Sequence, residues 1–163
     1  AGRQGAVGNW RDSFIRAPYM RNMTAGLGLV GDTLETAITW DRWPQLDAAV
    51  RDALNSALQK TCGGGTVTCR FTHVYPDGPA PYYTFEGLSK RGGEIETCDE
   101  LKAAASDAII AAGGTITHHH AVGKLHRPWY DQERPDLFAT AIKAAKKALD
   151  PNSILNPGVL VDP

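Results

Sequence analysis

Long apolar runs are missing from this 163-residue sequence, and so is any excess of charge of one sign. The longest runs of small apolar residues, Ala103–Ala105 and Ala108–Ala112, are too short to cross a bilayer, and no charged-then-apolar leader opens the chain. The 17 Lys and Arg residues against 18 Asp and Glu residues leave a net charge of -1, which argues against a nucleic-acid partner. We therefore expect a soluble, cytoplasmic protein that does not bind nucleic acid.

Cysteine is also scarce. Cys62, Cys69 and Cys98 are odd in number and lack the paired spacing of a zinc site. They fit a reducing compartment better than a disulfide scaffold. An initiator Met is absent, because the chain opens at Ala1, and we expect a piece of a longer polypeptide.

What the sequence does contain is a regular order of strand and helix patterns. Alternating residues predict strands, and apolar residues at helical spacing predict helices. The predicted elements are strand 33–40, helix 45–60, strand 66–75, strand 82–87, helix 97–112 and strand 115–120. In strand 66–75, alternation puts Phe71 and His73 on one face. The order is the ferredoxin-like βαββαβ pattern, an α+β fold with a four-stranded antiparallel sheet, two helices on one face and a further C-terminal helix at 135–149.

Three consecutive histidines, His118–His120, are the strongest chemical signal, because imidazoles in a row are poor core filler. On a strand, His118 and His120 would share one face and His119 would take the other. A catalytic or cofactor-facing role is favoured over structural histidines. No Asp, Glu or Cys at familiar metal spacing completes a site nearby, so no metal is expected.

Other motifs are weaker. Gly26-x-Gly28-x-x-Gly31 matches the dinucleotide fingerprint, but it precedes a strand instead of opening a helix, so a flexible spacer is favoured. Tyr82 begins a strand, where aromatic residues are usually core. Arg21 either reaches solvent or holds an anion, and Lys124 adds a basic group after the histidines.

The longest specific motif is GGTITHHHAVGKLHRPWY, residues 113–130, in which a glycine pair leads into the three histidines. It resembles the C-terminal signature of the alkyldihydroxyacetone-phosphate synthases, where a similar glycine pair leads into HHHGVGK. The closing ALDPNSILNPG, residues 148–158, resembles the end of the wider family of FAD-linked oxidases with the vanillyl-alcohol-oxidase fold. YMRN and LETAITWDR are similar to the synthases' arginine-containing and WDR segments, so the resemblance extends from about Tyr19 to Gly158.

The resemblance implies roles for individual residues. The synthases' active-site tyrosine falls on Tyr82, their histidine run on His118–His120 and their substrate-contacting arginine on Arg21. In the related dehydrogenases the histidine motif reads more like GEHGIG, so the triple histidine favours the synthase branch. Asn156, in the terminal NPG motif, would lie near the flavin. Ala121 departs from the usual glycine and adds a methyl group where the backbone would pass close to the cofactor.

For the reaction, the resemblance implies a redox-neutral exchange of an acyl for an alkyl group through a flavin adduct, as in ether-lipid synthesis. The expected site residues are catalytic Tyr82, His119 and His120, substrate-binding Arg21, His118 and Lys124, and cofactor-binding Asn156. FAD would be bound mainly by a domain outside this chain, so we expect the chain alone to be inactive. Expected partners are a small-molecule or lipid substrate, a membrane surface contacted for a lipid substrate, and a second copy in a homodimer.

The same resemblance implies two parts. Residues 1–130 would form a ferredoxin-like substrate (cap) domain, and residues 131–163 a helix and tail that pack on the FAD-binding domain. Two other functions stay open. One is an FAD-dependent dehydrogenase or oxidase of a 2-hydroxy acid or another alcohol, with Arg21 on the carboxylate and a histidine as base. The other is a non-catalytic ferredoxin-like module, for which the missing FAD-binding domain is the main argument.

Overall fold

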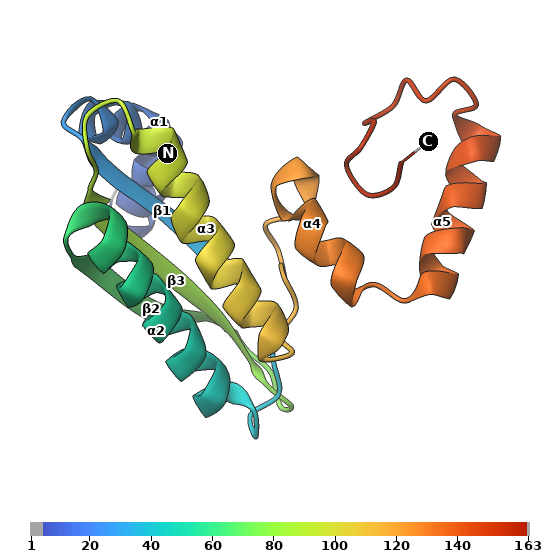
Figure 1. Cartoon of the computed structure of the whole chain (residues 1–163), viewed down its shortest axis with the longest axis horizontal. Helices are drawn as coiled ribbons and strands as arrows, with labels where there is room; N and C mark the ends of the chain where they lie inside the picture. Colours follow the sequence, from blue (N-terminus) through green and yellow to red (C-terminus); the bar gives the residue numbers. More distant parts are fainter. Residues whose placement is uncertain (1–4, 163) are drawn as a thin grey trace.

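Strand β3 (Pro79–Leu88) lies at the centre of a three-stranded antiparallel sheet, between β1 (Leu29–Glu35) and β2 (Gly65–Val74). The computed structural model describes residues 5–162, and Figure 1 shows their arrangement. The helices are α1 (Ala6–Gly26), α2 (Trp43–Cys62), α3 (Glu94–Ala111), α4 (Gly123–Glu133) and α5 (Asp136–Leu149). The predicted α+β fold class is confirmed.

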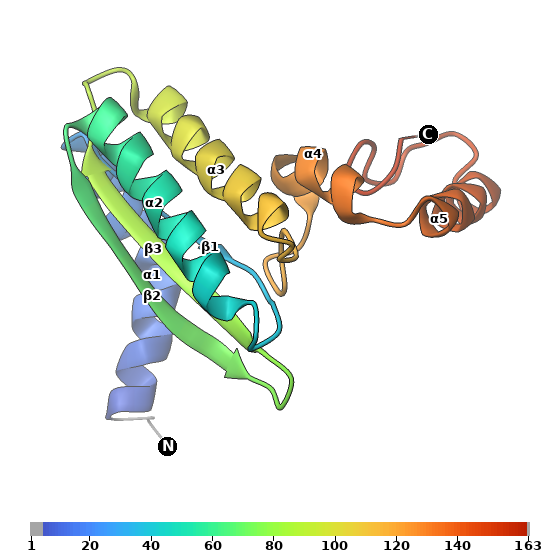
Figure 2. The ribbon, with the colours of Figure 1, turned by 60° about the horizontal axis from the view of Figure 1, so that its bottom comes forward.

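Helices α2 and α3 lie side by side on one face of the sheet (Figure 2). Leu46, Val50 and Leu54 recur at helical spacing along α2, and each is 0% exposed. They form one core with Tyr83 and Phe85 of β3. Complete burial of one such apolar side chain contributes about 1.5–3 kcal/mol. This packed layer therefore provides a rigid support for the opposite face of the sheet.

The predicted fourth strand at 115–120 is wrong, because this segment is a loop. The N–H of Thr115 donates to the carbonyl of Ala37, just past β1, at 3.2 Å. The N–H groups of His118–His120 then all turn toward one acceptor, Glu35. Successive N–H groups of a strand point to opposite edges, so a segment whose amides converge on one oxygen cannot extend the ladder. Within residues 5–162 the sheet has three strands, and the ferredoxin-like pattern lacks its last one.

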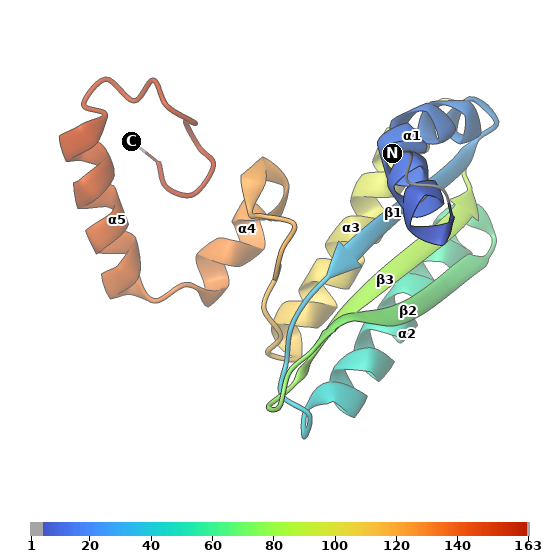
Figure 3. The same cartoon turned by 180° about the vertical axis from the view of Figure 1, so that it is seen from behind.

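The N-terminal stretch forms a helix, α1, which the sequence patterns did not predict. It lies on the other side of the sheet from α2 and α3 (Figures 1 and 3). Gly28, with a φ of 82°, turns the chain from α1 into β1. The glycine motif thus leads from a helix into a strand, which is the reverse of a dinucleotide-binding loop and fits the predicted spacer. Strand β1 (predicted at 33–40) begins four residues and ends five residues earlier than predicted.

Helices α4 and α5 and the terminal loop extend away from the sheet (Figure 1). Helix α4, which was not predicted, packs on α3, whereas α5 buries none of its residues. The expected division between residues 130 and 131 falls inside α4, and it stays a prediction. Across residues 5–162, no helix has both the length and the apolar character that crossing a membrane requires.

Candidate active site on the open face of the sheet

The face of the sheet opposite α2 and α3, called here the open face, carries a row of polar side chains. Backbone pairing places Glu35 of β1 beside Tyr82 of β3, and Tyr82 beside Arg70 of β2. Because side chains alternate along a strand, the next residue, Tyr83, points into the core instead. The guanidinium of Arg70 lies 4.7 Å from the centre of the Tyr82 ring. This row crosses all three strands and forms the base of the candidate site.

A β-bulge adds His73 to the open face. The register between β2 and β3 shifts between Phe71 and His73, so that Phe71 pairs with Pro81 and His73 with Ala80. Neighbouring residues of β3 point to opposite faces, so their partners do as well. Phe71 accordingly contacts the tryptophan at the start of α2, while the His73 ring lies 5.7 Å from that of His119. The prediction that Phe71 and His73 share a face is wrong because of this bulge.

Glu35 holds the loop that carries the three histidines. Its side chain is buried, and its Oε1 accepts hydrogen bonds of 2.7 Å from the Thr117 hydroxyl and from the N–H groups of His118 and His119. The N–H of His120 donates to the same oxygen at 2.8 Å. Successive N–H groups form a concave anion site, which is filled here by a carboxylate of the same chain. Burial alone would raise the pKa of Glu35. Together these hydrogen bonds lower the pKa by more than burial raises it, so the net pKa lies below the ordinary value.

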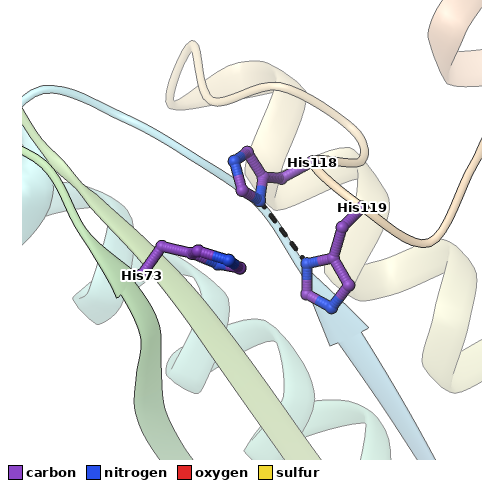
Figure 4. Close-up of side chains that lie close together, drawn as sticks. All are labelled: His73, His118 and His119. Carbon is purple, nitrogen blue, oxygen red and sulfur yellow. Dashed lines mark hydrogen bonds between the residues drawn. The ribbon is translucent and has the colours of Figure 1, made fainter.

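The loop places the imidazoles of His118 and His119 beside that of His73 (Figure 4). One ring nitrogen of each residue lies within 4.8 Å of the other two. The Nδ1 atoms of His118 and His119 are 3.4 Å apart, and His118 Nε2 is 3.1 Å from the Tyr75 hydroxyl. The expectation that strand alternation separates His118 from His119 is therefore wrong. Imidazoles grouped in this way could share a proton or hold a divalent cation, and the absence of a resident metal stays a prediction.

The phenol of Tyr82 lies beside the same loop. Its ring is stacked near His119 at 6.1 Å and meets His120 edge-on at 5.3 Å between ring centres. Burial lowers the pKa of His120, and the neighbouring His119 lowers it further, while the charge of Glu35 raises it by less. The net shift is downward, so His120 is neutral at physiological pH. A neutral imidazole next to a phenol can accept a proton.

Arg21 lies at a different place, beside the start of β1. Its guanidinium forms an ion pair with Asp32 at 2.7 Å, and the buried amine of Lys102 is 3.4 Å from the same carboxylate. Burial raises the pKa of Asp32, but Lys102 and the other donors outweigh it and the net shift is downward. Asp32 and Glu35 are three residues apart on β1, about 10 Å along the strand. The structure therefore does not bring Arg21 to the histidines.

Lys124 and Asn156 are also apart from the histidines. Lys124 lies in the first turn of α4 and is exposed. Asn156 belongs to the terminal loop, has a φ of 44° and lines a cavity of about 310 Å³. Asp150 holds this loop, because its carboxylate accepts 2.9 Å hydrogen bonds from two N–H groups of the loop. A hydrogen bond from Lys146, together with these two bonds, lowers the pKa of Asp150 to about 2. Neither Lys124 nor Asn156 forms a hydrogen bond or ion pair with Tyr82 or the histidines in the described part of the chain.

The sequence interpretation missed Glu35, His73 and Tyr75 as members of the site. Glu35 appears in the sequence as a polar position of a half-buried strand, yet its hydrogen-bond partners lie 82 to 85 positions further along the chain. No local pattern marks such a contact. His73 is turned toward the site by a bulge, which the alternating pattern of β2 does not reveal.

Comparison with known proteins gives a consistent result. The family described as FAD linked oxidases, C-terminal domain, matches residues 1–160. The chain is 33% identical over 148 residues to an alkyldihydroxyacetonephosphate synthase of Caenorhabditis elegans, covering 88% of this chain and 25% of that protein. It is 27% identical over 152 residues to the alkyldihydroxyacetonephosphate synthase of Trypanosoma brucei brucei, and the match covers 93% of this chain and 25% of that protein. It is 34% identical over 90 residues to the glycolate oxidase subunit GlcD of Bacillus subtilis, and the match covers 55% of this chain and 19% of that protein.

A solved structure of alkyldihydroxyacetonephosphate synthase has the same fold over 91% of this chain and 23% of its own, with a TM-score of 0.57 and 19% identity. The chain thus spans about a quarter of the length of the synthases it matches. The family match covers nearly every residue, including the strands, the histidine loop and the terminal segment. This chain belongs to the family of FAD-linked oxidase C-terminal domains.

Proposed function

We propose that this chain is the substrate-side part of an FAD-dependent enzyme of the alkyldihydroxyacetone-phosphate synthase type, which exchanges an acyl for an alkyl group. The observation that carries the proposal is the assembly of Tyr82 and the triple histidine on one face of the sheet. Strand β3 and a loop more than thirty residues later supply these groups. Their convergence, together with the similarity to named synthases, supports a catalytic role.

The residues present fit the reacting end of a flavin. A phenol, a neutral imidazole and further ring nitrogens stand together on the open face, and these are groups that bind, orient and move protons. The G-x-G-x-x-G match runs from helix to strand and does not suit a pyrophosphate. When bound, the flavin supplies the electrophilic centre of the reaction. We propose that Asn156 lies near it when the terminal loop packs on the flavin-binding part.

The protein groups have separate tasks in this proposal. His120, whose pKa is lowered, accepts the proton removed beside the substrate carbonyl, with His119 as the other proton-transfer group. Tyr82 passes a proton between substrate and imidazole, and Arg70 over its ring stabilises negative charge on the phenol oxygen. His118 and Lys124 hold the anionic substrate. Arg21 lies about 10 Å along β1 from these groups, so it can contribute only at a more distant part of the substrate, in exchange for its ion pair with Asp32.

The test uses the full-length gene product that contains this chain. Acylated dihydroxyacetone phosphate and a long-chain alcohol are supplied, and release of the fatty acid is measured. We expect turnover, and we expect Tyr82→Phe to lower kcat by about 10²–10⁴-fold, the usual contribution of general acid–base catalysis. Tyr83→Phe is the matched control, because Tyr83 lies one residue away in the core. Normal turnover by Tyr82→Phe would remove this residue from the mechanism.

An FAD-dependent dehydrogenase or oxidase of a 2-hydroxy acid is the second candidate, favoured by the similarity to the glycolate oxidase subunit GlcD. Its reaction passes electrons to an acceptor, whereas the synthase reaction is redox-neutral. Glycolate or lactate with a dye acceptor separates the two. Dye reduction without acyl exchange would favour the dehydrogenase. Membership of an FAD-linked oxidase family favours either enzyme over a non-catalytic module.

A further inference from the structure

We propose that Glu35 is a positioning residue that sets the tautomer of His119 as well as the backbone of the histidine loop. The two oxygens of its carboxylate have different surroundings. Oε1 accepts four hydrogen bonds from residues 117–120. Oε2 is buried and accepts none within residues 5–162. The first oxygen is sufficient to hold the loop, so the second is available for another task.

The unpartnered Oε2 faces two ring nitrogens. His119 Nδ1 lies 3.3 Å from it and His118 Nδ1 lies 3.7 Å from it. A buried carboxylate oxygen without a donor is costly, and a proton on the nearer nitrogen reduces that cost by placing positive charge beside the oxygen. Because the Glu35 side chain is 0% exposed, water does not compete for this oxygen. The geometry therefore favours the His119 tautomer that carries its proton on Nδ1.

The neighbouring contacts agree with this assignment. His118 Nδ1, 3.4 Å from His119 Nδ1, then takes the role of acceptor. Its own proton is left on Nε2, which is 3.1 Å from the Tyr75 hydroxyl. In this order of protons the His119 Nδ1–H donates to His118 Nδ1 and the His118 Nε2–H donates to the Tyr75 hydroxyl. The negative charge on Glu35 Oε2 attracts the Nδ1 proton from 3.3 Å without forming a hydrogen bond to it.

The consequence for chemistry depends on the proposed function and deepens it. A proton fixed on Nδ1 leaves His119 Nε2 unprotonated, which is the state that a general base requires. In the opposite tautomer the same nitrogen would be a donor and could not accept a proton. Glu35 would then act on the reaction through His119 without contacting the substrate.

Glu35→Gln tests the tautomer without removing the loop's acceptor. The glutamine carbonyl takes the place of Oε1, because Thr117 and the three N–H groups require an acceptor there. Its NH₂ group then faces His119 Nδ1 and offers a proton to it. We expect His119 to carry its proton on Nδ1 in the wild type and on Nε2 in Glu35→Gln, while the backbone amide signals of residues 118–120 keep their positions.

The measurement is the ¹⁵N NMR spectrum of the imidazoles, recorded at alkaline pH with EDTA so that the rings are neutral and free of metal. Five histidines keep the spectrum simple. A wild-type His119 protonated on Nε2, or a tautomer that Glu35→Gln leaves unchanged, would overturn the proposal. The wild-type spectrum alone decides if the variant does not fold. Neither flavin nor substrate is needed, so this result is independent of the proposed reaction.

Glu133→Gln is the matched control. Glu133 also binds the loop, accepting bonds from the Ile116 N–H at 2.8 Å and from the Thr115 hydroxyl at 3.1 Å. It does so two residues before the first histidine, and within the described residues it forms no hydrogen bond or ion pair with an imidazole. We expect Glu133→Gln to leave the His119 tautomer unchanged. A switch in this variant would show that loop shape sets the tautomer, and Glu35 would lose the role.

Discussion

Tyr82 and Tyr83 are neighbours in β3 but belong to two different regions of the molecule. Tyr83 is 0% exposed, packs in the core beneath α2 and α3, and donates to Asp47 Oδ1 at 3.1 Å. Burial, followed by the nearby Cys69 and Asp47, raises its pKa far above the ordinary value, so it stays a neutral hydroxyl. Tyr82 lies on the open face beside Arg70 and the histidines. Alternation along one strand thus separates packing from chemistry.

The two faces also differ in how they are built. The core face joins apolar side chains whose spacing along α2, α3 and β3 already indicates which of them will be buried. The open face depends on polar contacts between segments far apart in the chain, such as Glu35 with residues 117–120. We therefore expect substitutions on the core face to change stability most. Substitutions on the open face should change chemistry and pH dependence.

The largest effect is expected from Phe85→Ala. Phe85 is 0% exposed in the core, and removal of a buried phenylalanine costs about 3–5 kcal/mol because it leaves a cavity. Thr84→Ala, one position away on the open face, should change the free energy of unfolding by about 0.5 kcal/mol or less. Urea denaturation of both variants measures the difference. Equal losses would mean that the open face is packed as tightly as the core.

The next effect is a pH dependence that arises from Glu35. Its pKa is lower in the folded protein than the ordinary value of 4.5, so its charge stabilises the fold above that pH. This stabilisation is lost as the pH falls through the lower folded-state pKa. The free energy of unfolding lost in this way is about 1.4 kcal/mol for each unit by which the folded-state pKa lies below the unfolded-state pKa. We expect the wild type to lose more stability than Glu35→Gln between pH 5 and pH 3. Parallel stability curves would contradict the role of Glu35 as a buried anion.

The same contrast explains how far the sequence could predict the molecule. Periodicity located α2, α3, α5 and two of the strands because each pattern lies within one element. It failed for the segment 115–120, where four donors to Glu35 replace the ladder that a Thr- and Ile-containing run predicts. It also failed for His73, since a bulge leaves no local signature. The histidines stood out as three consecutive imidazoles, whereas Tyr82 was found through family resemblance, and their catalytic roles stay predictions.

A smaller effect should distinguish the two tyrosines in stability. Tyr83→Phe removes a buried donor to Asp47 and should cost about 1 kcal/mol, the net value of a typical hydrogen bond. Tyr82→Phe leaves the core untouched and should cost about 0.5 kcal/mol or less. Thermal or urea unfolding of the two variants measures both values. A larger loss for Tyr82→Phe would indicate that its hydroxyl supports the fold, which would weaken its assignment to proton transfer.

The smallest effect concerns the pair of Arg70 and Tyr82. The guanidinium lies 4.7 Å from the ring centre, and a partly exposed cation–π contact contributes about 0.5–1 kcal/mol. A double-mutant cycle with Arg70→Gln and Tyr82→Leu measures the coupling directly, because effects on each residue alone cancel. Coupling in that range would mean that Arg70 serves to place the phenol. Coupling near zero would mean that Arg70 does not interact favourably with the Tyr82 ring. Its charge on the open face would then be better suited to binding an anionic substrate than to placing Tyr82.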